Sequence, residues 1–213
     1  MLPRLRILID LLHGNAGASL ATHSLAVAGY PFASAVPFAT DERHRPILLL
    51  SRLAEHTQNL AADTRASLLV YGDDIEGEVS RVSLVGQIRP FEPEMPLVER
   101  YLRYQPAAER FLQLGDFRFY RLEPSQVRVI GGFGQAAWLD GERLTSAAAL
   151  TLDQEREALV ALSPAVPAGG ELLGIDCFGI DLRRDGRRSR VAFAAASTAE
   201  AISAVGKRAL AKA

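Results

Sequence analysis

The sequence predicts a mainly β protein: an antiparallel split β-barrel of six or seven strands, with flanking helices and a small α+β part at its C-terminal end. Residues 78–90 alternate between two sets of side chains, a period of two that is typical of an antiparallel strand. Residues 45–70 place a short polar helix between two apolar runs of strand length. A sheet of this many strands with few helices is expected to close, because closure removes the exposed edges of a flat sheet.

The expected elements before residue 130 follow one another with turns between them. Residues 2–12 carry apolar side chains at helical spacing, and residues 13–15 end that helix. Residues 29–31 form the turn of a hairpin. Residues 93–113 have helix-like spacing interrupted by Pro106, which predicts a helical excursion between strands. The expected strands are 19–28, 32–40, 47–50, 66–70, 78–90, 117–122 and 126–130.

The composition changes beyond residue 150. We expect a split-barrel domain at 1–150 and a small α+β domain at 151–213. Ser197 followed by Glu200 forms a capping-box pattern, which predicts the start of a last helix. The other expected elements are a helix at 150–162, a Pro/Gly/Ala linker at 163–170, and short strands at 172–181 and 189–193. A cluster of arginines is expected to form a solvated hairpin turn: Arg183, Arg184, Arg187, Arg188 and Arg190.

Composition limits the class of protein. With 213 residues, of which 48% are hydrophobic, the chain can bury a sizeable core. The 24 basic and 25 acidic residues nearly cancel, so nothing favours nucleic acid or an anionic membrane as a partner. Cys177 is the single cysteine, which excludes an internal disulfide and predicts a small buried side chain. No signal peptide or membrane span is recognisable, so a cytoplasmic location is expected.

The turn after the first apolar run of residues 45–70 has the composition of an anion site. A helix N-terminus directs unpaired N–H groups and a partial positive charge toward a ligand. Ser51, Arg52, His56 and Thr57 add side-chain donors around that point. The spacing alone supports equally well an alternative in which Ser51 caps the helix while Arg52 and His56 are solvated.

The same segment carries a family resemblance. A strand ending in a small hydroxyl residue, a polar crossover helix and the strand Arg65-Ala66-Ser67-Leu68-Leu69-Val70 resemble the flavin-binding split barrels related to pyridoxamine phosphate oxidase. Further pieces in register resemble the haem-utilisation branch of that superfamily, which includes FMN-binding and haem-degrading proteins. These pieces are Pro31-Phe32-Ala33-Ser34, Glu55-His56-Thr57-Gln58-Asn59-Leu60, Gly115-Asp116-Phe117, Tyr120-Arg121-Leu122-Glu123-Pro124, Gly131-Gly132-Phe133-Gly134 and Trp138-Leu139.

The chain departs from these relatives in its C-terminal part. In the family this part usually carries a helix with a motif that contains histidine and asparagine, and a histidine is the expected axial ligand where haem is bound. The four histidines here are His13, His23, His44 and His56, so none follows residue 56. Haem degradation is therefore disfavoured, with His23 and His56 as the remaining candidate ligands.

Two further features lie near the expected barrel rim. The glycine-rich run 131–134 follows a strand, but no amphipathic helix begins after it, which excludes a dinucleotide-binding fold. We expect these glycines to allow close backbone approach, with direct ligand contact as the alternative. Trp138, the single tryptophan, is expected in the core or an interface, or packed on the edge of a flavin ring.

The leading interpretation is an FMN-binding flavoprotein of oxidoreductase type. The cofactor-binding residues expected from the resemblance are Ser51, Arg52, His56 and Thr57 around the 5′-phosphate, Asn59 and Ser34 as orienting groups, and Trp138 near the ring. No catalytic acid, base or nucleophile pair is identifiable, and no metal site is expected. The alternatives are a haem-binding or haem-degrading protein, and a binding module without a cofactor.

The expected assembly is a homodimer with both cofactor sites at the subunit interface. A small barrel leaves little interior room for a flavin, so the ring is expected on an outer groove that a second subunit covers. Residues 93–113 and 133–138 also carry more aromatic surface than one small barrel can easily hide.

Overall fold

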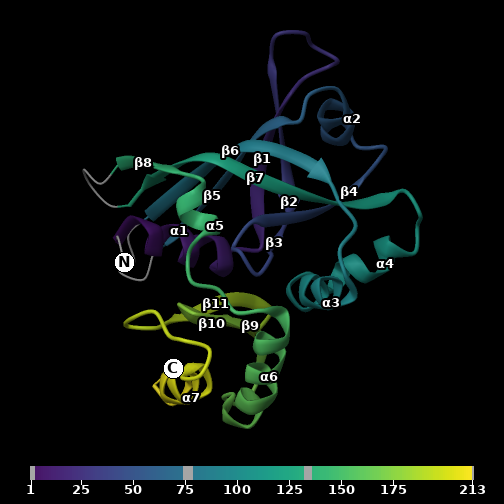
Figure 1. The fold of residues 1–213 in the computed structure, drawn as a ribbon. Helices are drawn as coiled ribbons and strands as arrows, with labels where there is room; N and C mark the ends of the chain where they lie inside the picture. Colours follow the sequence, from purple (N-terminus) through teal and green to yellow (C-terminus); the bar gives the residue numbers. More distant parts are fainter. Residues whose placement is uncertain (1–2, 74–78, 132–135, 213) are drawn as a thin grey trace.

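The computed structural model describes residues 3–73, 79–131 and 136–212, which form a large sheet and a small sheet below it (Figure 1). The large sheet runs in the order β2-β1-β5-β6-β7-β4-β3, and β8 pairs with β7. Every pairing between its strands is antiparallel. Its strands are β1 Gly17–His23, β2 Pro31–Pro37, β3 Ala39–Thr40, β4 Pro46–Ser51, β5 Arg65–Asp73, β6 Val79–Pro90, β7 Phe117–Ile130 and β8 Ala136–Asp140. This curled antiparallel sheet confirms the predicted split-barrel fold class.

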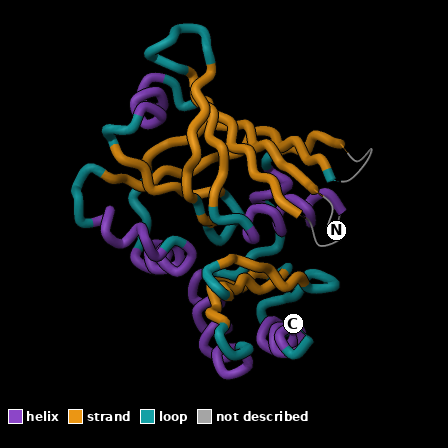
Figure 2. Tube along the Cα trace, turned by 180° about the vertical axis from the view of Figure 1, so that it is seen from behind, coloured by secondary structure: helices purple, strands orange, loops and turns teal. Residues whose placement is uncertain are grey.

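The small sheet has the order β11-β10-β9 and is accompanied by two helices on the side away from the barrel, as Figures 1 and 2 show from opposite directions. Its elements are α6 Leu152–Leu162, β9 Gly170–Asp176, β10 Gly179–Arg184, β11 Arg187–Ala192 and α7 Ile202–Leu210. The remaining helices are α1 Pro3–Gly14, α2 Glu55–Ala62, α3 Met95–Tyr104, α4 Glu109–Leu112 and α5 Glu142–Thr145, with short 3₁₀ turns at Pro106–Ala108 and Ser163–Ala165. Within the described residues, no helix is both long enough and apolar enough to cross a membrane.

Strand patterning explains the barrel. The residues of β6 alternate between buried and more exposed positions along most of its length, so one face of the strand lies in the core. In β4, by contrast, all residues from Pro46 to Leu50 are buried, because α3 covers the face that the barrel core does not: the backbone N–H of Leu49 donates to the Tyr101 hydroxyl. A register shift follows Val85, and a Cβ at Gly86 would lie 2.1 Å from the carbonyl oxygen of Glu123, so a glycine is needed there.

Helix α1 connects the two sheets. It contacts β5 and β6 of the barrel and also β10 and β11 of the small sheet. Leu8 and Leu12 of this helix belong to one buried apolar cluster that includes Leu84 in the barrel and Ile180 in the small sheet. The hydrophobic core is therefore continuous across residue 150, and the division into domains at 1–150 and 151–213 stays a prediction.

Several element predictions are confirmed. The first helix is α1, and the excursion between β6 and β7 contains α3, a 3₁₀ turn at Pro106 and α4. Cys177 is buried, with 3% of its surface exposed. Most of the glycine run, residues 132–134, lies outside the described residues.

Other element predictions are wrong. The first strand ends at His23 rather than residue 28, and the predicted strand 32–40 is divided into β2 and β3. Ser197 does not cap the last helix, which begins at Ile202 after Ala201: the Ser197 backbone N–H donates to the Cys177 carbonyl and its hydroxyl to the Thr198 carbonyl. A capping box forms instead at α6, between Thr151 and Gln154.

The arginine cluster lies on the predicted hairpin, but only part of it is solvated. The Arg190 side chain is only 4% exposed. Arg188 donates to the carbonyls of Asn15 and Tyr104, and Arg183 donates to the Arg103 carbonyl. These arginines fasten the small sheet to α1 and α3, and in the cluster only Arg184 and Arg187 are exposed.

Candidate functional site

The polar helix of the predicted phosphate cradle is α2, but Ser51 and Arg52 do not belong to it. Ser51 is the last residue of β4, and α2 starts at Glu55 after Ala54, so Ser51 neither opens nor caps the helix. The Ser51 hydroxyl donates to a carboxylate oxygen of Asp116 at 2.6 Å, and the Arg52 backbone N–H donates to the Asp116 carbonyl at 2.8 Å. The Arg52 residue is exposed. A carboxylate thus occupies the position beside Ser51 where an anion was expected.

The other predicted cofactor residues on α2 point toward β1 and β2. The Nδ1 atom of His56 lies 3.1 Å from the Ser34 hydroxyl, and burial lowers the pKa of His56. The Asn59 side chain is buried; it donates to the Thr22 hydroxyl and accepts from the Leu25 backbone N–H, so it fastens the end of β1. The Thr57 hydroxyl is buried and has no hydrogen-bond partner within the described residues. The structure therefore brings Ser34 and His56 together, and their role toward a cofactor stays a prediction.

Trp138 lies at the opposite end of the barrel from this cluster. Both residues pair with β7: Ser51 pairs with Phe117 and Trp138 pairs with Arg128. Arg128 follows Phe117 by eleven residues on that strand. At 3.3 Å per residue that separation is about 36 Å along the strand. The Arg128 guanidinium lies 5.6 Å from the centroid of the Trp138 ring, which is 56% exposed. Within one chain, Trp138 does not join the other predicted site residues.

An open groove of about 690 Å³ lies along the ends of β1 and β2. Ser19 pairs with Ala35 and with Leu69, two residues before Tyr71, so these side chains share the outer face of the sheet. The carbonyl of Ala16, beside β1, accepts a hydrogen bond from the Gln105 side chain. The lining is mainly small: Asn15, Ala16, Gly17, Ala18, Ser19, Ala35, Val36, Pro37 and Tyr71. Sequence reasoning missed this groove, because its residues are unremarkable in type and become adjacent only through strand pairing.

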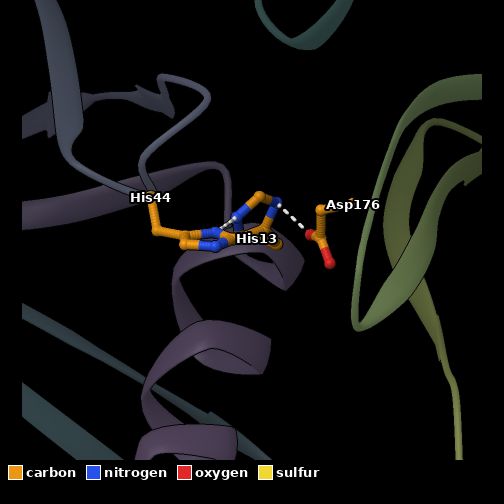
Figure 3. Close-up of side chains that lie close together, drawn as sticks. All are labelled: His13, His44 and Asp176. Atoms are coloured by element: carbon orange, nitrogen blue, oxygen red, sulfur yellow. Dashed lines mark hydrogen bonds and ion pairs between the residues drawn. The ribbon is translucent and has the colours of Figure 1, made fainter. Parts of the chain in front are cut away.

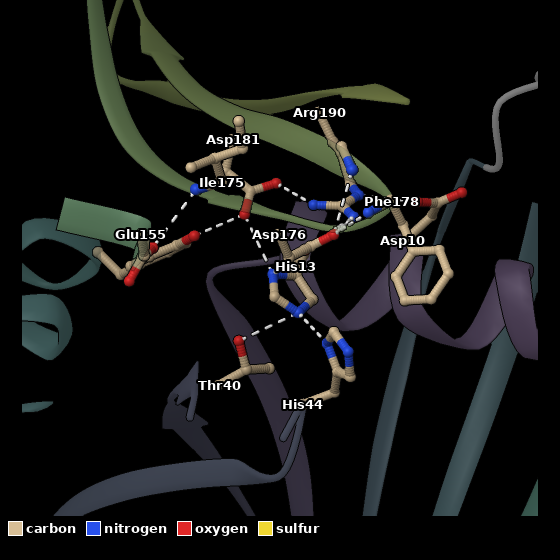
Figure 4. A network of polar contacts seen from close by, with 12 residues as sticks. Asp10, His13, Thr40, His44, Glu155, Ile175, Asp176, Phe178, Asp181 and Arg190 are labelled. Atoms are coloured by element: carbon tan, nitrogen blue, oxygen red, sulfur yellow. Dashed lines mark hydrogen bonds and ion pairs between the residues drawn. The ribbon is translucent and has the colours of Figure 1, made fainter. Parts of the chain in front are cut away.

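A buried polar cluster joins α1, the β3–β4 turn and the small sheet (Figure 3). His13 Nε2 lies 2.9 Å from His44 Nδ1, and His13 Nδ1 lies 3.1 Å from carboxylate oxygens of both Asp176 and Asp181. Arg190 reaches three carboxylates, with 2.7 Å to Asp10, 2.7 Å to Asp181 and 2.9 Å to Asp176 (Figure 4). No motif in the sequence points to this cluster, because its members come from distant parts of the chain.

Local structure places each member of the cluster. His13 lies in the last turn of α1, where the helix dipole favours positive charge. His44 has a φ of 63° in the turn between β3 and β4, where Asp41 accepts the backbone N–H groups of Arg43 and Arg45. Asp176 ends β9, and its Oδ1 accepts the backbone N–H groups of the next turn. The side chains are thus held by the ends of three separate elements.

Hydrogen bonding in the cluster determines which ring nitrogen of His44 carries the proton. The carbonyl of Ala148 can only accept, so His44 Nε2 carries a proton and its Nδ1 is the acceptor for His13. His13 Nε2 is then the donor toward His44, and His13 Nδ1 faces the carboxylates of Asp176 and Asp181. Burial, followed by the charge of His13, lowers the pKa of His44 to about 4. Burial opposes ionisation of Asp176, yet Arg190 and then His13 hold its pKa below the usual range.

The same three side chains could in principle hold a metal ion, since ligand atoms of His13, His44 and Asp176 lie within 4.8 Å of one another. All four ring nitrogens already have hydrogen-bond partners, however, and the Arg190 charge beside Asp176 opposes a cation. The adjoining cavity of about 10 Å³ has room for roughly one water. We therefore interpret the cluster as an ionic link between the two sheets.

Residues 9–146 match the family described as "CREG, beta-barrel". The chain belongs to this family. It is also 37% identical over 134 residues to the non-canonical haem oxygenase HOZ of Arabidopsis thaliana, an alignment that covers 62% of this chain and 41% of that protein. This chain therefore spans less than half the length of that relative. These matches confirm the split-barrel superfamily and the haem-utilisation branch recognised from the sequence.

Two further relatives agree with that assignment. Haem oxygenase HutZ of Vibrio cholerae is 28% identical over 129 residues, covering 54% of this chain and 70% of that protein. The structure of a haem-binding protein from Mycobacterium smegmatis superposes with a TM-score of 0.62 at 25% identity, covering 98% of this chain and 96% of the other. That coverage includes the small sheet. Each of these three relatives is named for haem.

Proposed function

We propose that this chain binds haem, and that the groove along β1 and β2 holds it. The groove carries the proposal: its volume of about 690 Å³ falls within the 300–1,000 Å³ usual for ligand sites. Gly17 and the alanines at 16, 18 and 35 have side chains of at most one carbon, so a planar macrocycle can approach the strands closely. Bound haem would supply iron for ligand and redox chemistry, while the chain supplies position and excludes water.

The flavin alternative has less support from the geometry. An FMN phosphate beside Ser51 would meet the Asp116 carboxylate that already accepts the Ser51 hydroxyl proton at 2.6 Å. Two anions in contact repel, and Arg52 is an exposed side chain whose charge is screened by solvent. Recognition of FMN by the phosphate is therefore disfavoured, which supports haem as the cofactor.

Titration with ferric haem and with FMN, followed by absorbance, tests the proposal. We expect wild-type protein to give a saturable shift of the Soret band with one haem per chain, and no saturable change with FMN. Ala35→Trp should fill the groove and abolish the Soret shift, whereas Ala61→Trp, on the exposed side of α2, should leave it unchanged. Stoichiometric FMN binding without haem binding would overturn the proposal, and an unaffected Ala35→Trp variant would remove haem from the groove.

We further propose that a second copy of the chain covers the groove. The outer face of the large sheet exposes Tyr71, Val79, Val85 and Trp138, each at least 40% accessible. Strand pairing puts them on one face, because Tyr71 lies opposite Arg81, two residues after Val79, and Trp138 lies opposite Arg128, which pairs with Ser83. An open groove on that face leaves part of a bound ring exposed, whereas ligand sites usually bury at least about 70% of the ligand. The aromatic residues of α3 are not part of this surface, since Tyr101 and Tyr104 are buried.

Light scattering tests the dimer. We expect a particle of twice the chain mass of 23.1 kDa, because a specific interface should bury at least about 1,000 Å². Val85→Glu should shift the population to monomer by placing a charge on the apolar face. Val160→Glu is the matched control, since Val160 is 72% exposed on α6, on the small-sheet side of the molecule. A monomeric wild-type protein that still binds haem tightly would contradict the shared site.

A further inference from the structure

Tyr71 is the strongest candidate iron ligand in the groove. It lies on β5, is 63% exposed, and its hydroxyl makes no hydrogen bond within the described part of the chain. The other polar side chains of the lining are Asn15 and Ser19, whose neutral oxygens are poor ligands for ferric iron. Asn15 is also engaged, because its amide donates to the Leu11 carbonyl. A phenolate oxygen, by contrast, is an established axial ligand of ferric haem.

No histidine of the chain reaches the groove. His13 and His44 are buried with both ring nitrogens of each engaged in hydrogen bonds. His56 contacts Ser34, which points to the other face of β2 from the groove residue Ala35. His23 follows Gly17 by six residues, about 20 Å along β1 at 3.3 Å per residue. A haem in the groove therefore cannot take its ligand from an imidazole of the same chain.

A positive charge stands next to Tyr71. Arg81 is its directly opposed partner across the β5–β6 ladder, so the two side chains leave the same face of the sheet about 5 Å apart at their Cβ atoms. Arg81 is exposed and can approach either an anionic tyrosine oxygen or a haem propionate. Either contact would favour a ferric haem coordinated at this position.

From these observations we infer that Tyr71 coordinates the iron of ferric haem in the groove. The inference rests on the proposed haem binding and adds its ligand. It accounts for haem binding by a chain whose C-terminal part has no histidine. Residues 1–150 alone supply the ligand, so the small sheet would support the groove rather than complete the iron site.

The test is ferric haem titration of the full chain, with resonance Raman and absorbance spectra of the complex. We expect wild-type protein to show the vibrations and the charge-transfer absorption of an iron-bound tyrosinate. Tyr71→Phe should lose these signals and weaken haem binding by at least about tenfold, since even groups behind a metal ligand contribute tenfold to a hundredfold. Tyr71→His should bind haem again with the spectrum of a histidine-ligated haem.

Tyr30→Phe is the matched control, because Tyr30 is similarly exposed, at 67%, on the turn at the far end of β1 and β2. It should keep both the affinity and the tyrosinate signals. If Tyr71→Phe keeps the wild-type spectrum and affinity, Tyr71 is not the ligand while haem binding stands. If wild-type protein shows no stoichiometric haem complex, the proposed function fails and this inference fails with it.

Discussion

Arg190→Met is expected to lower the free energy of unfolding by about 3–5 kcal/mol, the usual cost of removing one partner from a buried ionic group. Arg190 donates to Asp10 on α1, Asp176 on β9 and Asp181 on β10. Methionine fills a similar volume without the charge, so three carboxylates that are each at most 10% exposed would lose their shared counterion. The measurement is urea denaturation followed by far-UV circular dichroism.

Arg187→Met is the control for this substitution. Arg187 lies on the same strand, β11, but is exposed, and substitutions at such positions usually change stability by less than about 0.5 kcal/mol. Equal urea midpoints for the two variants would show that the buried charges are not linked through Arg190. Because Arg190 joins α1 to the small sheet, we also expect Arg190→Met to expose the small sheet to protease before the barrel.

The barrel was predictable because its signals are local. The period of two in β6, the apolar runs of β4 and β5, and the end of α3 shortly before Pro106 are each contained in a short window of sequence. Two capping-box patterns of the same type nevertheless had different outcomes. Thr151 and Gln154 form a capping box at the start of α6. Ser197 caps no helix, and its backbone N–H donates to the Cys177 carbonyl. Tertiary contacts decide between such equal local patterns.

The buried cluster could not be predicted from the sequence. His13 and His44 are 31 residues apart, and Asp181 lies 168 residues from His13, so no motif spacing connects them. The arginine run around Arg190 has the composition of a solvated turn, and only strand pairing shows which arginine points inward. The groove is similarly invisible in the sequence, because Tyr71 meets Ser19 and Ala35 only across the β2-β1-β5 ladder. Long-range pairing thus defines both the ionic link and the candidate haem site.

His44 makes the stability of the protein depend on pH. Its pKa falls from 6.5 to about 4 on folding, so between these values the unfolded chain binds more protons than the folded chain. The free energy of unfolding should therefore be highest above pH 6.5 and fall as the pH drops toward 4, by about 3 kcal/mol from this group. Protonated His44 would present Nδ1–H to the Nε2–H of His13, and it also lies near Asp176 and Arg190.

The measurement is the urea midpoint at several pH values from 7.5 down to 4.5, a range above that in which Asp176 and Asp181, with their lowered pKa values, become protonated. His44→Asn removes the titrating ring and keeps a residue that tolerates the left-handed φ of 63°. It should lower stability at neutral pH yet flatten the pH dependence.

His23→Asn, at an exposed position, should keep the wild-type slope. His56 also has a pKa lowered by burial and adds a slope of the same sign, so the difference between wild type and His44→Asn is the quantity that isolates His44. A variant slope equal to that of wild type would show that His44 is not the group whose protonation loosens the link between the two sheets.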